Sequence, residues 1–337
     1  MKRVTIKDIA RVADVSYASV SRALSGSPEI SEATREHVLK ICRDMGYTTN
    51  YIARAMVKKK TELIGLIVSD ISNPFMSELG FYMEQRAREL GYNLIFCNSN
   101  HDAERERQVF EVLVGRQVDG IILVPCSSES YGNVQPYLGQ VPTVFVSENL
   151  RDVPESYVAI DNFKGTYAGV EYLYGLGHRN ILYFGRRKSS ITHQHRAEGY
   201  IAACRDLGIE PQFCNSSYAY SSMQYGYQLA KALFQKPINY TAIFAAADSV
   251  AIGIMGAAEE AGIRIPEDIS LLGFDNIPDS GLPRINLTTI EQPKKSIASI
   301  AVDILAERIN DPAAGYAHRI LLPQLVERST CRRITDK

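Results

Sequence analysis

The sequence predicts a small all-helical N-terminal region followed by a large α/β region with two parallel sheets. Three observations lead to this division. The first 46 residues contain three segments with apolar residues at helical spacing and a capping residue before each. From residue 63 onward, short apolar runs alternate with longer amphipathic segments, as in parallel sheets covered by helices. The 337 residues are also too many for one small core.

The first predicted helix begins after Thr5, and Asp8, three positions later, completes a capping box. Its apolar residues share one face: Ile6, Ile9, Ala10 and Ala13. The turn that follows contains Asp14, and Asp is one of the few residues besides glycine that tolerate a left-handed backbone. Ser16 is expected to cap a second helix, whose apolar residues return to the same core: Val20, Ala23 and Leu24. Two short helices joined in this way form a helix-turn-helix, and the second one has the dimensions to lie in a DNA major groove.

The outward face of the second helix carries the candidate contacts to DNA. Arg22 can offer two donors to a guanine edge, a contact that discriminates between bases by about 1–3 kcal/mol. Tyr17 can reach a base edge or a phosphate, and Ala18 can contact an apolar group such as a thymine methyl. The other polar residues are expected to contact phosphates, with helix capping as their alternative role: Thr5, Ser16, Ser19 and Ser21. For the whole motif, the alternative is an ordinary helical hairpin with a polar outer face.

A third helix is expected to begin at Ser31 and Glu32 and to end at Gly46. Residues 50–57, NYIARAMV, favour a further helix, although one this short is marginal in water without a partner. Three lysines follow at positions 58–60, and a flexible linker is the alternative interpretation of that run.

The charge is divided unevenly along the chain. Residues 1–60 contain 12 Lys and Arg against 6 Asp and Glu, a formal charge of +6, and the remaining residues carry 25 basic against 32 acidic side chains, a charge of −7. A basic small domain on an acidic body suits a DNA reader whose other surfaces do not attract nucleic acid.

Several classes of protein are disfavoured. No run of about 18 apolar residues predicts a membrane span, and the N-terminus lacks the apolar run of a secretion signal, so a cytoplasmic protein is expected. The six cysteines are scattered without a CxxC pair, which indicates reduced thiols. No metal or other cofactor is expected, because His193 and His195 lack a third ligand nearby. An enzyme is not expected, because GxGxxG, GxSxG and Walker patterns are all absent.

The body is predicted to contain strands that alternate with helices. The strands are expected at 63–68, 93–96, 120–124, 143–146, 180–184, 242–245 and 270–273. Glycines that end several helices suit a left-handed cap: Gly91, Gly177, Gly208 and Gly262. A weak internal echo of helix, glycine and strand supports two halves that meet near Asp161.

Polar and aromatic residues follow the predicted strands, where open α/β sheets bind their ligands. They are Asp70, Asn73, Phe75, Ser147, Asp161, Arg196 at a loop–helix junction, Asp248, Asp275 and Gln292. This mixture fits a polyhydroxylated ligand held by hydrogen bonds, with Phe75 or Tyr220 stacking on it. Asp161 and Asp248 each precede a helix, and N-capping is their alternative role.

Together these residues resemble the LacI/GalR family of bacterial transcription regulators, over the helix-turn-helix and most of the chain after it. The resemblance implies an N-terminal all-α helix-turn-helix headpiece at residues 1–49 and a hinge helix and linker at 50–61. It also implies an α/β two-lobed periplasmic-binding-protein-like (type I) domain at 62–337 for effector binding and dimerisation. Lobe 1 is expected at about 62–161 plus 291–321, and lobe 2 at about 162–290 plus 322–337, with three crossovers. The helix that begins near Pro293 should return to lobe 1.

The resemblance also implies roles for individual residues. Arg196, in Arg-x-x-Gly-Tyr, and Asp275, in Gly-Phe-Asp-Asn, match positions where family members hold their effector. Ala247 replaces a common Asn, so the effector is not named by analogy. In the family hinge, a leucine from each subunit enters the minor groove, and Met56 stands at that place here. The hinge contacts to DNA are therefore expected from Asn50, Ala53 and Met56.

The expected function is a homodimeric, sequence-specific transcriptional repressor of a sugar-utilisation operon. Its expected partners are a near-palindromic double-stranded DNA operator and a small-molecule effector of the carbohydrate class, which changes the angle between the lobes. An activator, or a regulator controlled by a protein partner, is the alternative within the same family. A periplasmic-type sugar receptor is disfavoured by the basic headpiece, and the lack of a leucine heptad tail favours a dimer over a tetramer.

Overall fold

The computed structural model describes residues 4–47, 60–147, 154–186, 190–215 and 222–334. These belong to two compact units, Met1–Thr61 and Glu62–Lys337, and each unit is described by itself. Among the described helices, none combines the length and the hydropathy that a membrane span requires.

The first unit contains the three predicted helices, α1 (Ile6–Val12), α2 (Tyr17–Ser25) and α3 (Glu32–Asp44). The predicted capping box is present, since the Thr5 amide donates to Asp8 Oδ2 at 3.0 Å and the Asp8 amide donates to Thr5 Oγ1. Asp14 adopts the predicted left-handed conformation, with φ 52°. The helices bury a small common core of Ile9, Ala13, Val20, Ala23, Val38 and Cys42. These contacts confirm the helix-turn-helix.

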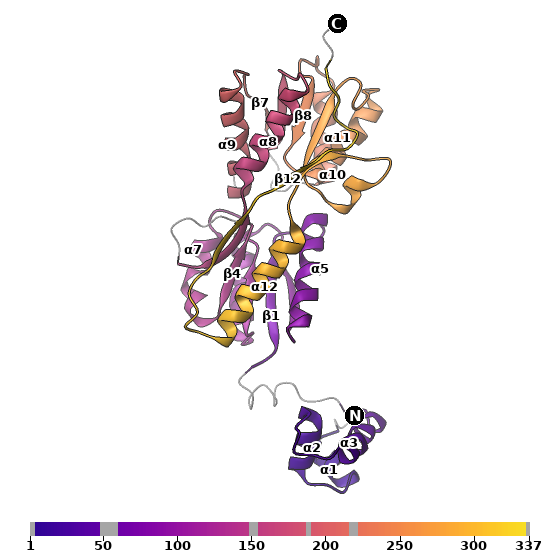
Figure 1. The fold of residues 1–337 in the computed structure, drawn as a ribbon, viewed down its shortest axis with the longest axis vertical. Coiled ribbons are helices and arrows are strands. Elements are labelled where there is room, and N and C mark those ends of the chain that lie inside the picture. Colours follow the sequence, from indigo (N-terminus) through magenta and orange to yellow (C-terminus); the bar gives the residue numbers. More distant parts are fainter. Residues whose placement is uncertain (1–3, 48–59, 148–153, 187–189, 216–221, 335–337) are drawn as a thin grey trace. The chain divides into compact units, whose positions relative to one another are not determined.

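The second unit begins with a parallel six-stranded sheet, which with its helices is called lobe 1 (Figure 1). Its strands, in spatial order, are β11 (His318–Leu321), β5 (Ser156–Ile160), β4 (Thr143–Val146), β3 (Gly120–Leu123), β1 (Leu63–Val68) and β2 (Asn93–Asn98). Side chains alternate along β1, so Leu66 and Val68 face one layer of helices and Ile67 faces the other. The first layer is α5 (Pro74–Glu89) and α12 (Lys294–Asn310), and the second is α6 (Ala103–Gly115), α7 (Ser130–Val134) and the 3-10 helix η1 (Gln135–Gln140).

Lobe 2 is built on a second six-stranded sheet. Its order is β12 (Gln324–Val326), β10 (Thr288–Glu291), β9 (Ser270–Asp275), β8 (Ala242–Ala245), β6 (Ile181–Arg186) and β7 (Gln212–Asn215), with β12 antiparallel to β10. Helices α8 (Asn162–Gly175) and α9 (Ile191–Asp206) cover one face, α10 (Met223–Leu233) and α11 (Asp248–Glu260) cover the other, and the 3-10 helix η2 (Pro278–Gly281) follows β9. The backbones of α10 and α11 approach closely because Gly253 has no side chain: a Cβ there would overlap the carbonyl oxygen of Met223.

The chain passes between the sheets after β5, after β10 and after β11, which confirms the three predicted crossovers. Helix α12 packs beside α5 in lobe 1, as predicted for the helix near Pro293 (Figure 1). The predicted strands are present, and the glycines that end their helices have positive φ values of 83° at Gly91 and 97° at Gly177. Strands β5, β7, β10, β11 and β12 were not predicted.

Candidate functional site

A pocket lies where the carboxyl ends of the strands of lobe 1 and lobe 2 face each other, as predicted for open α/β sheets. Lobe 1 lines it with Ser69, Asn73, Phe75, Met76, His101, Val124, Pro125, Cys126 and Ser147. Lobe 2 and the connection after β10 line it with Ser190, Thr192, His193, Arg196, Ala247, Asp275 and Gln292. The walls therefore combine an aromatic ring, hydroxyls, amides, imidazoles and one pair of opposite charges.

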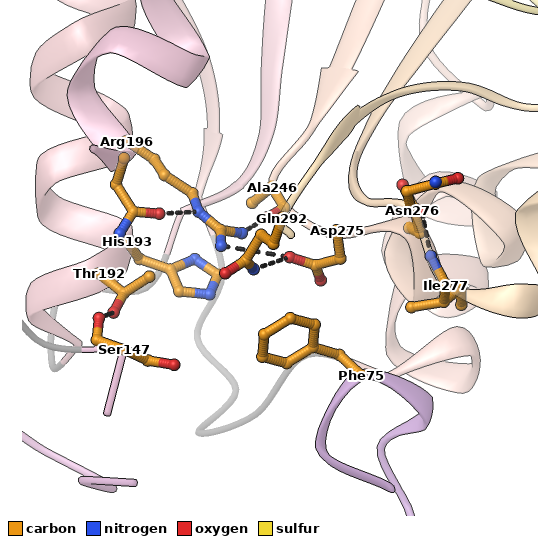
Figure 2. Close-up of polar contacts among 12 residues, drawn as sticks. Phe75, Ser147, Thr192, His193, Arg196, Ala246, Asp275, Asn276, Ile277 and Gln292 are labelled. Atoms are coloured by element: carbon orange, nitrogen blue, oxygen red, sulfur yellow. Dashed lines mark hydrogen bonds and ion pairs between the residues drawn. The ribbon is translucent and has the colours of Figure 1, made fainter. Parts of the chain in front are cut away.

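The guanidinium of Arg196 is fixed in the pocket by three hydrogen bonds (Figure 2). It lies in the second turn of α9, and its guanidinium is buried against the ring of Phe274, 3.6 Å from the centroid. Its Nε donates to Asn162 Oδ1 at 2.8 Å, its Nη1 to the carbonyl of Ala246 at 2.6 Å, and its Nη2 to Asp275 Oδ1 at 3.2 Å. Contacts with three different elements hold the guanidinium plane in one orientation.

Asp275 supplies the counter-charge at the end of β9. Its Oδ1 also accepts a hydrogen bond of 2.6 Å from Gln292 Nε2, which joins the carboxylate to the connection between the lobes (Figure 2). Burial raises the pKa of this carboxyl, and the nearby charge of Arg196 opposes that effect. Because the charges of Arg196 and Asp275 face each other, this wall offers donors and acceptors with little net charge.

The opposite wall comes from lobe 1. Phe75 is 4% exposed and lies in the first turn of α5, where Asn73 caps the helix by accepting the Phe75 amide at 3.0 Å. Figure 2 shows the Phe75 ring opposite the side chains of Asp275 and Gln292. Ser147 follows β4, and its carbonyl accepts a hydrogen bond from Thr192 Oγ1 of lobe 2 at 3.2 Å. The Oγ of Ser147 is buried and has no hydrogen-bond partner among the described residues, which leaves it available to a ligand.

Left-handed backbone conformations gather around the pocket. Ser147 has φ 73°, His101 has φ 58°, and Asp275 has φ 116°, although none of them is glycine. Such conformations cost about 1–3 kcal/mol each and persist where the surrounding contacts impose them, commonly at binding sites. Their concentration at the strand ends supports a ligand site here.

Six of the predicted effector residues come together in this pocket: Asn73, Phe75, Ser147, Arg196, Asp275 and Gln292. Arg196 belongs to α9 and not to the loop before it. Asp161 has its alternative role, because it caps α8 by accepting the Lys164 amide at 2.9 Å. Tyr220 lies outside the described residues.

Asp248 does not line the pocket, contrary to the prediction. Its side chain is fully buried beneath the strand ends, where it accepts hydrogen bonds from the amide of Ile277 at 3.0 Å, from Ser280 Oγ at 2.6 Å and from Thr289 Oγ1. Burial, followed by the negative charge of Asp275, raises its pKa to about 7. Both carboxyl oxygens of Asp248 accept hydrogen bonds from the protein, and those to Ile277 and Ser280 stabilise the turn after β9. Sequence position alone could not distinguish this role from contact with a ligand.

Other pocket residues were not predicted as effector contacts. Thr192 and His193 precede Arg196 by four and three positions on α9, so helical spacing places them on the same face. His101 had no comparable signal, because its place depends on the left-handed backbone at Asn100 and His101. In the part of the chain that the structure describes, no group of three His, Cys, Asp or Glu side chains could hold a metal ion.

The predicted DNA-contacting face of the headpiece is exposed. Tyr17, Ala18, Ser21 and Arg22 point away from the helical core, and the side chain of Tyr17 is 56% exposed. Arg22 Nε lies 3.0 Å from Glu29 Oε2.

Thr5 is also exposed, and it caps α1. Ser16 caps α2, where the Ser19 amide donates to Ser16 Oγ at 3.0 Å. Both residues therefore have the alternative capping role that the sequence left open. Asn50, Ala53 and Met56 lie outside the described residues.

Comparisons with known proteins agree with this architecture. Residues 5–50 match the family model of bacterial regulatory proteins of the lacI family, and residues 170–331 match that of the periplasmic binding protein-like domain. The chain is 33% identical to catabolite control protein A of Priestia megaterium over 330 residues, which cover 96% of this chain and 98% of that protein. It is 31% identical to the ribose operon repressor of Haemophilus influenzae over 329 residues, 97% of this chain and 98% of that protein.

Solved structures extend the likeness to the three-dimensional fold. The lac repressor dimer bound to operator and the anti-inducer ONPF superposes with a TM-score of 0.87 at 28% identity, over 98% of this chain and 100% of that chain. A LacI family transcriptional regulator from Enterococcus faecium with bound ribose superposes with a TM-score of 0.72 at 28% identity, over 81% of this chain and 100% of that chain. With a matching headpiece, a matching body and relatives similar over nearly their whole length, this chain belongs to the LacI family of bacterial transcriptional regulators.

Proposed function

We propose that this protein is a homodimeric repressor that binds a near-palindromic operator and responds to a carbohydrate in the pocket between its lobes. In this proposal residues 1–49 read DNA, residues 50–61 form the hinge, and residues 62–337 bind the effector and dimerise. The proposal rests on one observation: the same chain has an exposed helix-turn-helix face and a polar, partly aromatic pocket lined by both lobes.

In the DNA complex, α2 enters the major groove and Arg22 donates to a guanine edge. Tyr17 and Ala18 read neighbouring bases, and the capping residues Thr5 and Ser16 place helix ends next to phosphates. The charge of +6 in the first 60 residues supports binding to the DNA backbone. Asn50, Ala53 and Met56 then contact the minor groove.

Dimerisation is supported by apolar side chains that a monomer leaves exposed on lobe 1. Phe81 and Leu90, at and just beyond α5, are 54% and 39% exposed, and Phe96, on the edge strand β2, is 39% exposed. A second copy that covers this surface with its own equivalent would bury these side chains by two-fold symmetry.

The walls of the pocket favour a neutral polyhydroxylated ligand. Arg196 is neutralised by Asp275, so an anionic group would meet no uncompensated arginine there. Ser147 Oγ, Gln292 and Asp275 can exchange hydrogen bonds with hydroxyl groups, and the Phe75 ring can cover an apolar sugar face. We therefore infer that the effector is a free sugar or a nucleoside and not a phosphosugar.

Effector binding acts on DNA through the lobes. A ligand that contacts Phe75 and Ser147 on one side and Arg196 and Asp275 on the other stabilises one inter-lobe angle, because only that angle satisfies both walls. A coupling of about 1–3 kcal/mol between such sites changes the affinity for the operator by about 5- to 150-fold.

The test begins with a thermal-shift screen of sugars, nucleosides and phosphosugars on the full-length protein. A compound that raises Tm should also change the affinity for a palindromic duplex selected from a random library. Arg22→Ala should lose sequence-specific binding and keep the thermal shift. Asp275→Ala, assayed below its lowered Tm, should keep DNA binding and lose the response. If the protein selects no duplex over random competitor at physiological salt, the proposal is wrong.

A further inference from the structure

A buried lysine lies at the point where the chain returns from lobe 2 to lobe 1. Lys294 is the first residue of α12, two residues after Gln292, and it is 5% exposed. Lysine is almost never buried to this extent unless its ammonium group is fully paired. The neighbouring residue, Lys295, is exposed, so the burial is specific to position 294.

On the lobe 2 side, the Lys294 ammonium holds the turn that follows β9. Its Nζ donates to the carbonyl of Asp275 at 3.1 Å and to the carbonyl of Asn276 at 2.6 Å. These two residues have φ values of 116° and 51°, and the positive values belong to the same turn whose carbonyls converge on the ammonium. The charged donor therefore stabilises a backbone conformation that non-glycine residues rarely adopt.

On the lobe 1 side, the same ammonium contacts helix α5. Lys294 Nζ lies 3.2 Å from Glu78 Oε2, and the Glu78 side chain is 20% exposed. Helix α5 packs along α12 and carries Phe75, one turn before Glu78, into the wall of the pocket. One side chain thus contacts a backbone turn in lobe 2 and a carboxylate in lobe 1.

The turn is the one that presents Asp275 to the pocket. Asp275 uses its side chain toward Arg196 and Gln292 and its backbone carbonyl toward Lys294. A ligand-imposed change in the backbone torsions of Asp275 also moves the carbonyl that Lys294 binds. The ammonium must then follow the turn and weaken its contact with Glu78, or hold both and move α5 with it.

We propose that Lys294 is a positioning residue that couples the Asp275–Asn276 turn of lobe 2 to helix α5 of lobe 1. Lys294 links the two walls of the pocket without contacting the ligand. A change in the backbone conformation at Asp275 is transmitted through it to α5, the helix that bears Phe75. This inference rests on the proposed function, because it takes Asp275 as an effector contact.

Hydrogen exchange of the full-length protein, measured by mass spectrometry without any added ligand, tests the coupling. Lys294→Met should accelerate exchange of the amides of residues 275–277 by roughly tenfold, because hydrogen bonds from a charged donor are lost. It should also accelerate exchange in the first turns of α5. The decisive variant is Glu78→Gln, which leaves every lobe 2 residue intact and should still accelerate exchange at 275–277 by roughly threefold, the equivalent of a weakened ion pair.

Matched controls exist on the same two helices. Lys295→Met removes an exposed lysine from α12, and Glu84→Gln removes a carboxylate from α5 that lies 3.7 Å from Arg88 of the same helix. Neither variant should change exchange at 275–277. Acceleration by Glu78→Gln but not by Glu84→Gln supports the coupling.

If Glu78→Gln leaves the turn unchanged, Lys294 acts only within lobe 2 and the proposal is overturned. Should Lys294→Met fail to fold, Glu78→Gln decides the question alone. Because the readout needs neither effector nor DNA, its outcome is independent of the screen that tests the proposed function.

Discussion

Replacing Arg196 and Asp275 one at a time should destabilise the protein by two amounts whose sum exceeds the effect of replacing both. The two residues are 3% and 6% exposed, and Nη2 and Oδ1 are 3.2 Å apart. Removing one partner of a buried pair leaves an uncompensated charge, at a cost of about 3–5 kcal/mol. We expect Arg196→Met and Asp275→Asn each to lower the free energy of unfolding by about that amount.

The double variant leaves no charge stranded between these two positions. Asn162 Oδ1 and the carbonyl of Ala246 still lose their donor, so part of the loss remains. The sum of the two single effects should therefore exceed the double effect by about 2–3 kcal/mol. Because burial raises the pKa of Asp275, its carboxyl can take up a proton when Arg196 is absent, and Arg196→Met should cost less in acidic than in alkaline buffer.

Urea unfolding followed by far-ultraviolet circular dichroism measures these free energies. The control is the ion pair of Arg264 and Asp268, whose Nη2–Oδ1 distance of 2.8 Å is shorter but whose side chains are 69% and 39% exposed. Solvent screening should leave the coupling of that pair close to zero. Additive effects at Arg196 and Asp275, or equal couplings in both pairs, would refute the reasoning from burial.

Three further outcomes are expected. Gly253→Ala should lose about 1–3 kcal/mol of stability, because a Cβ there meets backbone that cannot move aside. Gly256→Ala, on the same helix, would place a Cβ at ordinary contact distance from Tyr227 of α10 and should be neutral or gain up to about 1 kcal/mol. Equal Tm values for the two variants would contradict this account of α10 and α11. The pKa of Asp248 is raised to about 7, so protonation of this carboxyl favours the folded state. As pH rises from about 4 to 7, the free energy of unfolding of the wild-type protein should therefore fall by up to about 1.4 kcal/mol per pH unit relative to that of Asp248→Asn. Parallel stability profiles of the two proteins would show that the carboxyl is already ionised. Glu29→Gln should raise DNA affinity roughly two- to fivefold in fluorescence anisotropy, because Glu29 competes with DNA for Arg22; unchanged affinity would mean that the contact does not compete.

The sequence was sufficient to predict those features whose structure depends on residues close by in the chain. The caps at Thr5 and Ser16 and the left-handed turn at Asp14 follow from side chains within three residues of the backbone they satisfy. The long apolar run of β1 and the glycine after α5 are equally local. The helix-turn-helix, the alternation of strands and helices, and the edge where the pocket forms were therefore predictable.

The largely exposed strands β11 and β12 were harder to predict than buried strands of similar length such as β3 and β4. β12 has three residues and β11 has four, and both are strands only because β10 and β5 supply hydrogen-bond partners at their edges. A segment of this length has no period that separates it from a loop.

The order of helices and strands, the basic headpiece and the polar residues at one edge of the sheets all follow from the sequence. The role of each of those polar residues depends on the folded structure. Asp248 and Asp275 both follow strands of lobe 2, yet Asp275 lines the pocket and Asp248 supports the turn beneath it. Lys294 and Lys295 are adjacent, yet only Lys294 reaches Glu78 and the carbonyls after β9. These roles differ because the hydrogen-bond partners of Asp248 and Asp275 come from other elements, 17 to 79 positions away. No local pattern in the sequence records on which side of a strand end or helix those partners will lie.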